Sequence, residues 1–228
     1  MANEPQYDVK VIIDEEELGM DVISKLSTKK TIYSAEQITG NANAGQVEMI
    51  VRRDISNFSK AAPIKIFVRQ KQTSQWKQKG EYFINERVIN RDTGVCSING
   101  FDALFKANAK YKSSVANVGS GGLWWGNIGA VMSEILEDLD ITPSSNLSTL
   151  ISTWSGTGAQ EGKTISLEED WTYGEALSRI AFYLCGNFTI NDDGMLDFIT
   201  LSLPEFSNLL INENGDYIVF GDTRIRLS

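Results

Sequence analysis

Hydrophobic and polar residues alternate along the first hundred positions, which is the period-two pattern of half-buried β-strands. The alternation is clear in residues 7–14 and 62–70 and continues through 45–56. Residues 80–102 repeat it on both sides of the turn sequence RDTG at 91–94, which predicts a β-hairpin. Several short strands separated by turns predict a small barrel or sandwich in this part of the chain.

Beyond Asn99 the apolar residues change to helical spacing. Residues 100–111 are expected to form a short helix, and 112–127, rich in Ser, Gly and Asn, a mobile loop or a boundary. The GSGG within this loop has no GK[ST] after it, so a phosphate-binding loop is not indicated. A longer helix is predicted to start at the N-cap Asn127, with one apolar stripe. The stripe comprises Ile128, Val131, Met132, Ile135, Leu136 and Leu139.

A second amphipathic helix is predicted to begin after Thr172. Thr172 and Glu175 stand three residues apart, the spacing of a capping box. Gly186 is expected to end this helix in the left-handed conformation. The segment between the two helices, residues 142–164, is rich in Ser and Thr and is expected to be mostly loop.

The stretch NFTINDDGMLDFITL, residues 187–201, places an acidic tip between two apolar runs. If Gly194 were the sixth position of a calcium-binding EF-hand loop, Thr189 and Thr200 would occupy positions that need carboxylates. Apolar and polar residues alternate on both sides of the tip. The stretch is therefore predicted to be a β-hairpin whose turn, 191–194, ends in a glycine with positive φ.

The 228-residue chain contains no histidine, which limits the chemistry open to it. Ser-His-Asp and Cys-His nucleophiles and imidazole-ligated zinc sites are excluded. The cysteines, Cys96 and Cys185, lie too far apart in sequence for a CxxC pair and are expected to be small buried residues. An enzyme would depend on carboxylates, lysine or tyrosine, so we expect no enzymatic activity, metal or cofactor.

The formal net charge of −9 is unevenly distributed. Residues 1–110 hold 16 Lys and Arg against 14 Asp and Glu, a net of +2, whereas residues 111–228 hold 5 against 16, a net of −11. An acidic second half argues against nonspecific nucleic-acid binding, which needs clustered cations. No apolar run approaches the length of a membrane span, so no membrane insertion is expected.

Two alternative functions depend on particular side chains. A carboxylate-dependent cell-wall hydrolase would need paired acids. The candidates are Glu168, Glu169 and Asp170 with Asp192 and Asp193. A carbohydrate-binding module would use Trp124 and Trp125, which adjoin the glycine-rich segment and could stack on sugar rings or contact a partner. Packing in a core or interface is favoured for the two tryptophans, and turn or helix-terminus roles for the acids.

Two segments carry a resemblance to a known family. GVCSINGFDALFKANAKY, residues 94–111, closes the β-rich region with a strand and a helix, and residues 171–201 run from a capped helix into the acidic hairpin. Together they resemble the tail-hub proteins (baseplate hub or tail tip) of bacteriophages, prophages and related contractile injection systems. The resemblance implies a structural protein of the virion tail, assembled in the host cytoplasm. It also implies a ring, usually a homotrimer, that joins the tail tube to spike or fibre proteins.

The predicted fold is therefore α+β, with a β-barrel-like tube domain and a smaller helix-and-hairpin domain. We expect the tube domain to span residues 1–107 and the insertion domain, with two amphipathic helices and the hairpin, to span 108–202. Because hub domains are typically discontinuous, residues 203–228 are expected to return to the first domain as one or more strands. The partners expected from the resemblance are further copies of the chain, the tail tube and the spike or fibre proteins.

Overall fold

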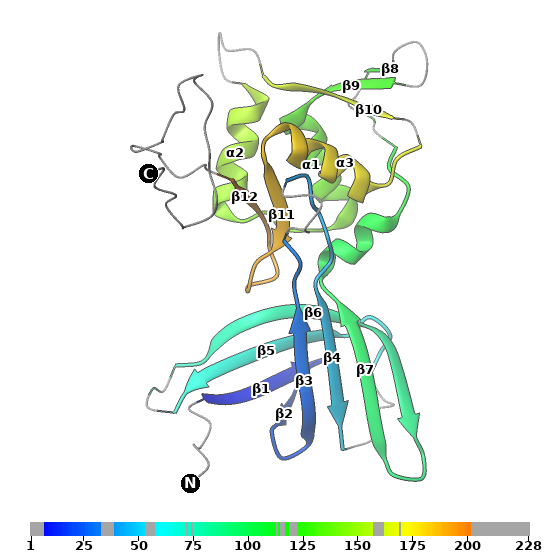
Figure 1. Cartoon of the computed structure of the whole chain (residues 1–228), viewed down its shortest axis with the longest axis vertical. Coiled ribbons are helices and arrows are strands. Elements are labelled where there is room, and N and C mark those ends of the chain that lie inside the picture. Colours follow the sequence, from blue (N-terminus) through cyan, green and yellow to red (C-terminus); the bar gives the residue numbers. More distant parts are fainter. Residues whose placement is uncertain are drawn as a thin grey trace, which may run out of the picture.

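The computed structural model describes residues 7–32, 39–52, 58–71, 73, 75–112, 114, 117–118, 123–156, 162–168 and 170–201. This part of the chain forms two lobes that meet at a narrow waist (Figure 1). Each lobe has its own cluster of buried apolar side chains. The first lobe is a curled antiparallel sheet, and the second combines helices with short strands, so the predicted α+β class with a barrel-like unit is confirmed.

The first lobe is one seven-stranded antiparallel sheet in the order β2-β1-β5-β6-β7-β4-β3. Its strands are β1 (Tyr7–Ile13), β2 (Glu16–Gly19), β3 (Ile23–Lys29), β4 (Gln46–Val51), β5 (Pro63–Gln70), β6 (Lys77–Asn90) and β7 (Val95–Phe101). The two edge strands, β2 and β3, are consecutive in the chain, and only residues 20–22 join them. The sheet must therefore curl until its two edges meet at this turn, where the Val22 N–H donates to the Gly19 carbonyl over 3.2 Å.

The long strand β6 turns the corner of the half-barrel. Its first half pairs with β5 and its second half with β7, and the register shifts at Ile66/Phe67 and at Ile84/Glu86. Such bulges increase the local twist and bend a strand, which is what closing a sheet requires. The alternate side chains that face inward form the core of this lobe. They include Val11, Ile13, Val47, Met49, Ile64, Ile66, Tyr82, Ile84, Cys96 and Ile98.

The predicted β6–β7 hairpin is confirmed. Gly94 at its turn has a φ of 66°, and the Asn90 side-chain oxygen accepts hydrogen bonds from the backbone N–H groups of Asp92 (3.0 Å) and Thr93 (3.2 Å). Asparagine suits this position because its side chain satisfies turn donors that the strands cannot reach.

The second lobe follows β7. Its elements are the 3₁₀ helix η1 (Ala103–Asn108), β8 (Asn117–Val118), β9 (Leu123–Asn127), α1 (Ile128–Leu139), α2 (Ser145–Ser155), β10 (Thr164–Glu168), α3 (Tyr173–Tyr183), β11 (Gly186–Ile190) and β12 (Leu196–Thr200). Strands β8 and β9 occupy part of the predicted loop 112–127, and β9 pairs with β10. Strands β11 and β12 form a separate hairpin.

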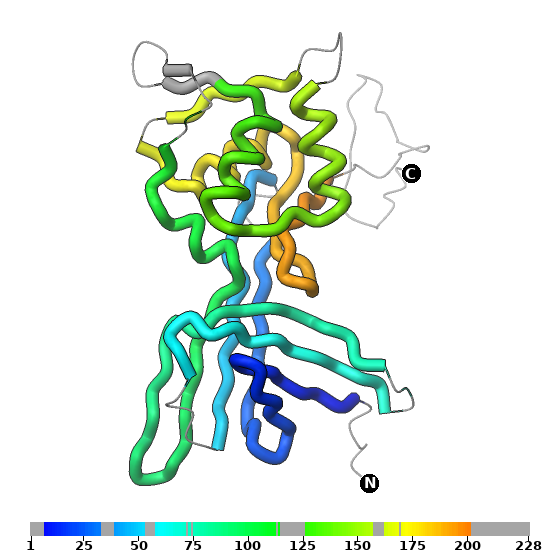
Figure 2. Tube along the Cα trace, turned by 180° about the vertical axis from the view of Figure 1, so that it is seen from behind, coloured from blue at the N-terminus to red at the C-terminus, as the bar shows by residue number. Residues whose placement is uncertain are grey.

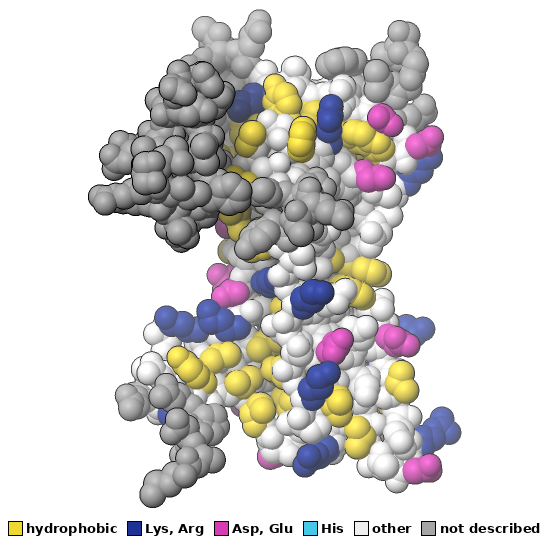
Figure 3. Space-filling view, in the orientation of Figure 1, with side chains coloured by type: hydrophobic (Ala, Val, Ile, Leu, Met, Phe, Trp, Pro, Cys, Tyr) yellow, Lys and Arg dark blue, Asp and Glu magenta, His cyan; other side chains and the backbone are white. Residues whose placement is uncertain are grey.

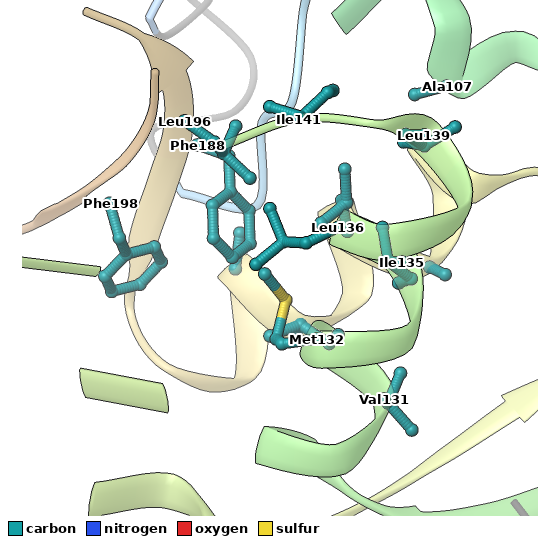
Figure 4. Packing of buried hydrophobic residues seen from close by; sticks show 14 of the residues in the cluster. Ala107, Val131, Met132, Ile135, Leu136, Leu139, Ile141, Phe188, Leu196 and Phe198 are labelled. Carbon is teal, nitrogen blue, oxygen red and sulfur yellow. The ribbon is translucent and has the colours of Figure 1, made fainter. Parts of the chain in front are cut away.

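Helix α1 is the centre of this lobe, and its predicted apolar stripe is confirmed. All six residues of the stripe are buried, and Asn127 caps the helix by accepting a hydrogen bond from the Ala130 N–H over 3.1 Å. Figure 4 shows Met132 and Leu136 directed toward Phe188 of the hairpin. The helix thus holds the hairpin in place through shared apolar packing.

Helix α3 has the predicted capping box. The Thr172 hydroxyl accepts from the Glu175 N–H over 3.2 Å, and the Glu175 carboxylate accepts from the Thr172 N–H over 2.7 Å. The expected stop was wrong: the left-handed residue after the helix is Cys185, with φ 53°, and Gly186 already begins β11. Gly186 is needed for space instead, because an added Cβ would lie 2.7 Å from the Ile199 carbonyl oxygen and would collide with the Phe198 ring.

The prediction that 142–164 is mostly loop was wrong, because α2 spans Ser145–Ser155. Leu147 and Trp154 are buried on one face, two turns apart. The hydroxyl-rich background masked this spacing, since Ser and Thr have modest helix propensity. Here their hydroxyls bond carbonyls one turn back within the helix, as from Ser152 to Ser148 (3.1 Å) and Thr153 to Thr149 (3.0 Å).

The acidic hairpin at 187–201 is confirmed. Phe188 faces Phe198 and Ile190 faces Leu196 across the two strands, and all four are buried. At the tip, Gly194 has a φ of 82°. The Asn191 side chain accepts from the N–H groups of residues 193 and 195, each over 3.0 Å.

Cys96 is buried, as expected, whereas Cys185 is exposed, contrary to the prediction, because it occupies the turn between α3 and β11. Residues 203–228 lie outside the described residues, so their return to the first lobe stays a prediction. The predicted division into domains at residues 107 and 202 also stays a prediction.

Candidate functional site at the waist

The chain passes between the lobes more than once. The chain leaves the sheet toward the second lobe after β3, residues 39–45 bring it back to β4, and it crosses again from β7 to η1 (Figures 1 and 2). These crossings place residues from the first fifty positions beside the hairpin near position 190. The waist is therefore built from segments that are distant in sequence.

The first contact at the waist is a buried clasp between residues 40–41 and strand β11. The Gly40 N–H donates to the Gly186 carbonyl over 2.9 Å, and the Phe188 N–H donates to the Asn41 carbonyl over 2.8 Å. The Asn187 side-chain oxygen accepts from the Asn41 N–H over 2.9 Å, and both asparagines are buried. Residues 40–41 thus cover one edge of the hairpin, which would otherwise present unpaired backbone groups.

The second contact is centred on Asp102, which is only 2% exposed. One of its carboxylate oxygens accepts from the Gly45 N–H (2.7 Å), and the other accepts from the Leu104 N–H (3.1 Å). The Asp102 N–H donates in return to the Gly45 carbonyl over 3.0 Å. One side chain therefore joins the chain just before β4 to the start of the 3₁₀ helix η1, at the two places where the chain crosses between the lobes.

Burial governs the ionisation of this group. Removal from water raises the pKa of Asp102 to about 6, although its two backbone hydrogen bonds and nearby Lys30 act in the opposite direction. Burial, together with the charge of Asp102, also raises the pKa of Tyr82, in β6, to about 12. The waist thus holds a carboxylate whose charge is costly to the folded state.

The third contact is the tip of the β11–β12 hairpin, which reaches down onto the first lobe. The Lys79 ammonium lies 3.0 Å from one Asp192 oxygen, and Lys30 lies 3.9 Å from the other. The Gln78 amide donates to the Asp192 carbonyl over 3.0 Å, and Lys30 donates to the Ile190 carbonyl over 2.9 Å. The acidic tip is therefore an inter-lobe contact as well as a turn.

Apolar side chains remain exposed on both lobes, interspersed with charged ones (Figure 3). They include Phe105, Phe182 and Tyr183, which are about half exposed. Phe105 stacks on Phe101 with a centroid separation of 5.0 Å. The stacked pair lines a hollow of about 430 Å³ beside β3 and β4, whose other lining residues are Lys29, Thr31, Asn43, Ala44, Gln46 and Asn108.

Strand β9 contains both tryptophans predicted as a possible partner contact. Trp124 pairs with Leu167 and Trp125 with Ser166 across β9 and β10. Their side chains lie outside the described residues, so their role as an interface or sugar platform stays a prediction.

The candidate carboxylates have different partners. Asp170, before α3, forms an ion pair of 2.6 Å with Lys110, and that hydrogen bond lowers the pKa of Asp170. Asp192 instead pairs with the first lobe, and Glu169 lies outside the described residues. Of the four described candidates, Asp170 and Asp192 are used in charge pairing, whereas Glu168 ends β10 and Asp193 is exposed in the hairpin turn. In the described part of the chain, no group of three or more acidic, cysteine or histidine residues could hold a metal ion, and no described helix is long and apolar enough to cross a membrane.

Sequence reasoning missed the residues that build the waist. Asn41 and Asn187 are 146 positions apart, and Asp102 and Gly45 are 57 apart. Asp102 carried one local signal, because an aspartate before ALFKAN fits an N-cap. Nothing local marks it as a link between lobes.

The comparisons with known proteins identify the fold. No protein-family model and no curated protein match the sequence. Among solved structures, the chain is similar to the 43 kDa tail protein of prophage MuSo2 from Shewanella oneidensis, with TM-score 0.51 and 13% identity, over 87% of this chain and 57% of that one. It is also similar to the tail protein from Neisseria meningitidis MC58, with TM-score 0.54 and 12% identity, over 85% of this chain and 50% of that one. The chain thus spans about half the length of these proteins, and it shares their fold.

Proposed function

We propose that the chain is a non-enzymatic structural subunit of a bacteriophage or prophage tail. Its place is the baseplate hub or tail tip, where it joins the tail tube to the spike or fibre assembly. The observation that carries the proposal is the similarity in fold, over 87% and 85% of the chain, to two tail proteins. A curled sheet beside a helical lobe also fits the tail-hub resemblance of the sequence.

Assembly would proceed through surfaces that one copy leaves uncovered. Within the described residues, β3 is an edge strand that pairs only with β4. An edge strand offers unpaired backbone groups to a neighbour. The hollow lined by Phe101 and Phe105 lies at the end of the same strand, next to Lys29. A neighbouring copy in a homotrimeric ring could cover both features with one surface.

The mass of the assembly in solution tests this proposal. We expect light scattering to give the mass of a trimer for the purified chain, alone or with the tail-tube protein, and electron micrographs to show rings. Phe105→Ser should shift the population toward monomer, because it removes a half-exposed aromatic from the proposed contact. Val88→Ser is the matched control, since Val88 is also exposed but lies on β6.

A chain that stays monomeric in the presence of the tail-tube protein would count against the hub assignment. Equal effects of the two substitutions would show that the Phe105 surface is not the contact. Clearing of cell-wall gels by the wild type would favour a hydrolase instead.

A further inference from the structure

We propose that the tip of the β11–β12 hairpin is a salt-sensitive latch that sets the angle between the two lobes. The latch consists of Asp192, held by Lys79 and Lys30, with Gln78 on the adjacent carbonyl. Lys79 and Gln78 lie on β6 of the first lobe, and Lys30 directly follows β3. This contact is independent of any role in a tail.

The latch lies to one side of the strands that join the lobes. In both views, the hairpin tip stands apart from the crossing segments formed by residues 39–45 and 101–103 (Figures 1 and 2). It contacts the first half of β6 through Lys79 and Gln78, and it contacts the chain just after β3 only through the Lys30 side chain. A rotation of one lobe about the crossings therefore separates the tip from the sheet without breaking the chain.

The buried clasp serves as the pivot. Residues 40–41 bond to Gly186 and Phe188, and Asp192 lies about five residues further along the hairpin, roughly 15 Å of extended chain. On this lever arm, a rotation of roughly 10° moves the tip by about 2.6 Å, which is enough to break an ion pair. Small changes in lobe angle are thus coupled to the state of the latch.

The contact is exposed enough to open and close. The side chains of Asp192 and Lys79 are 48% and 51% exposed. Exposed ion pairs are weak and are screened by salt, in contrast to the buried clasp. The fit is nevertheless close, because an added Cβ on Gly194 would collide with the Glu81 carboxylate. The hairpin tip therefore sits against β6 and is held there by interactions that ionic strength can weaken.

Distance measurements between spin labels on the two lobes test the latch in the full chain. Cys185 is exposed in the second lobe and Cys96 is buried, so a label on Cys185 and one on Thr93→Cys, in the exposed β6–β7 turn, report the lobe angle. We expect one narrow distribution of the distance between the two labels at low salt, and a broader one at high salt. Asp192→Asn should broaden it at low salt, with the open fraction increased about fivefold for the loss of one exposed ion pair.

Asp193→Asn is the matched control, because it removes the same charge one residue away, on an exposed side chain outside the contacts that form the latch. It should leave the wild-type distribution unchanged. The proposal is overturned if Asp192→Asn retains the narrow distribution at both salt concentrations, or if Asp193→Asn broadens it equally. Circular dichroism of each variant confirms that the lobes stay folded.

Discussion

The buried carboxylate of Asp102 makes a specific prediction about how stability depends on pH. Its pKa rises from 3.8 to about 6 on folding, mainly because burial disfavours the charged form. A shift of about two pKa units corresponds to about 3 kcal/mol between the protonation states. The pKa of Asp102 is higher in the folded state than in the unfolded state, so the protonated carboxyl favours folding. This contribution to the free energy of unfolding is complete below about pH 4 and is lost as the pH rises through about 6.

Asp102→Asn removes this ionisation while retaining one oxygen acceptor for the two backbone donors. The free energy of unfolding of both proteins should be measured by urea denaturation between about pH 4 and about pH 8. As the pH rises over this interval, the free energy of unfolding of the variant should increase relative to that of the wild type by up to about 3 kcal/mol. The lowered pKa values of the exposed Asp170 and Glu175 act in the opposite direction, but equally in both proteins, and cancel in the difference.

Asp14→Asn, in the exposed turn between β1 and β2, is the control, because it removes a carboxylate far from the waist, and the pH dependence found for Asp102→Asn should exceed that found for Asp14→Asn. A pH-independent difference for Asp102→Asn would refute the reasoning. So would a difference that moves against the variant as the pH rises, because the carboxylate would then be more stable charged than neutral in the fold.

Four substitutions, one of them a control, test the packing and one helix cap by thermal or urea denaturation. Gly186→Ala should cost about 2 kcal/mol or more, because its Cβ has no room beside Phe198, whereas Gly174→Ala, in the first turn of α3, should stay within about 1 kcal/mol; equal losses would contradict the steric argument. Leu147→Ala should lower the free energy of unfolding by about 3 kcal/mol, since this side chain of α2 is fully buried. A loss below about 1 kcal/mol would show that α2 adds little to the core. Thr172→Ala should cost about 1 kcal/mol through loss of the helix cap, and an unchanged melting temperature would mean that the cap contributes nothing.

Where the determinants of structure are local, the sequence was a sufficient guide. The stripe of α1 repeats every three or four residues, and the capping box of α3 needs only Thr172 and Glu175. The hairpin at 187–201 likewise follows from alternation around a glycine that adopts positive φ. Each of these signals is complete within one element, because the helix period, the strand period and turn chemistry act over a few residues.

Local signals failed where packing outweighed propensity. Helix α2 has a background of Ser and Thr that resembles a loop, and burial of Leu147 and Trp154 makes it helical. Gly186 carried the signature of a helix stop, yet the close approach of β12 is what requires a glycine there. In both cases the deciding contact comes from another element, which a local pattern does not contain.

The sequence by itself determined helices α1 and α3 and the two hairpins, β6–β7 and β11–β12, and it excluded histidine-dependent chemistry. Only the tertiary structure decided what those segments do to one another. The turn residue Asp192 becomes a contact with the first lobe, and the N-cap Asp102 becomes a buried link with a raised pKa. The physical reason is that Asp102 and Gly45 are 57 residues apart and Asp192 and Lys79 are 113 apart, and such separations leave no periodic trace along the chain.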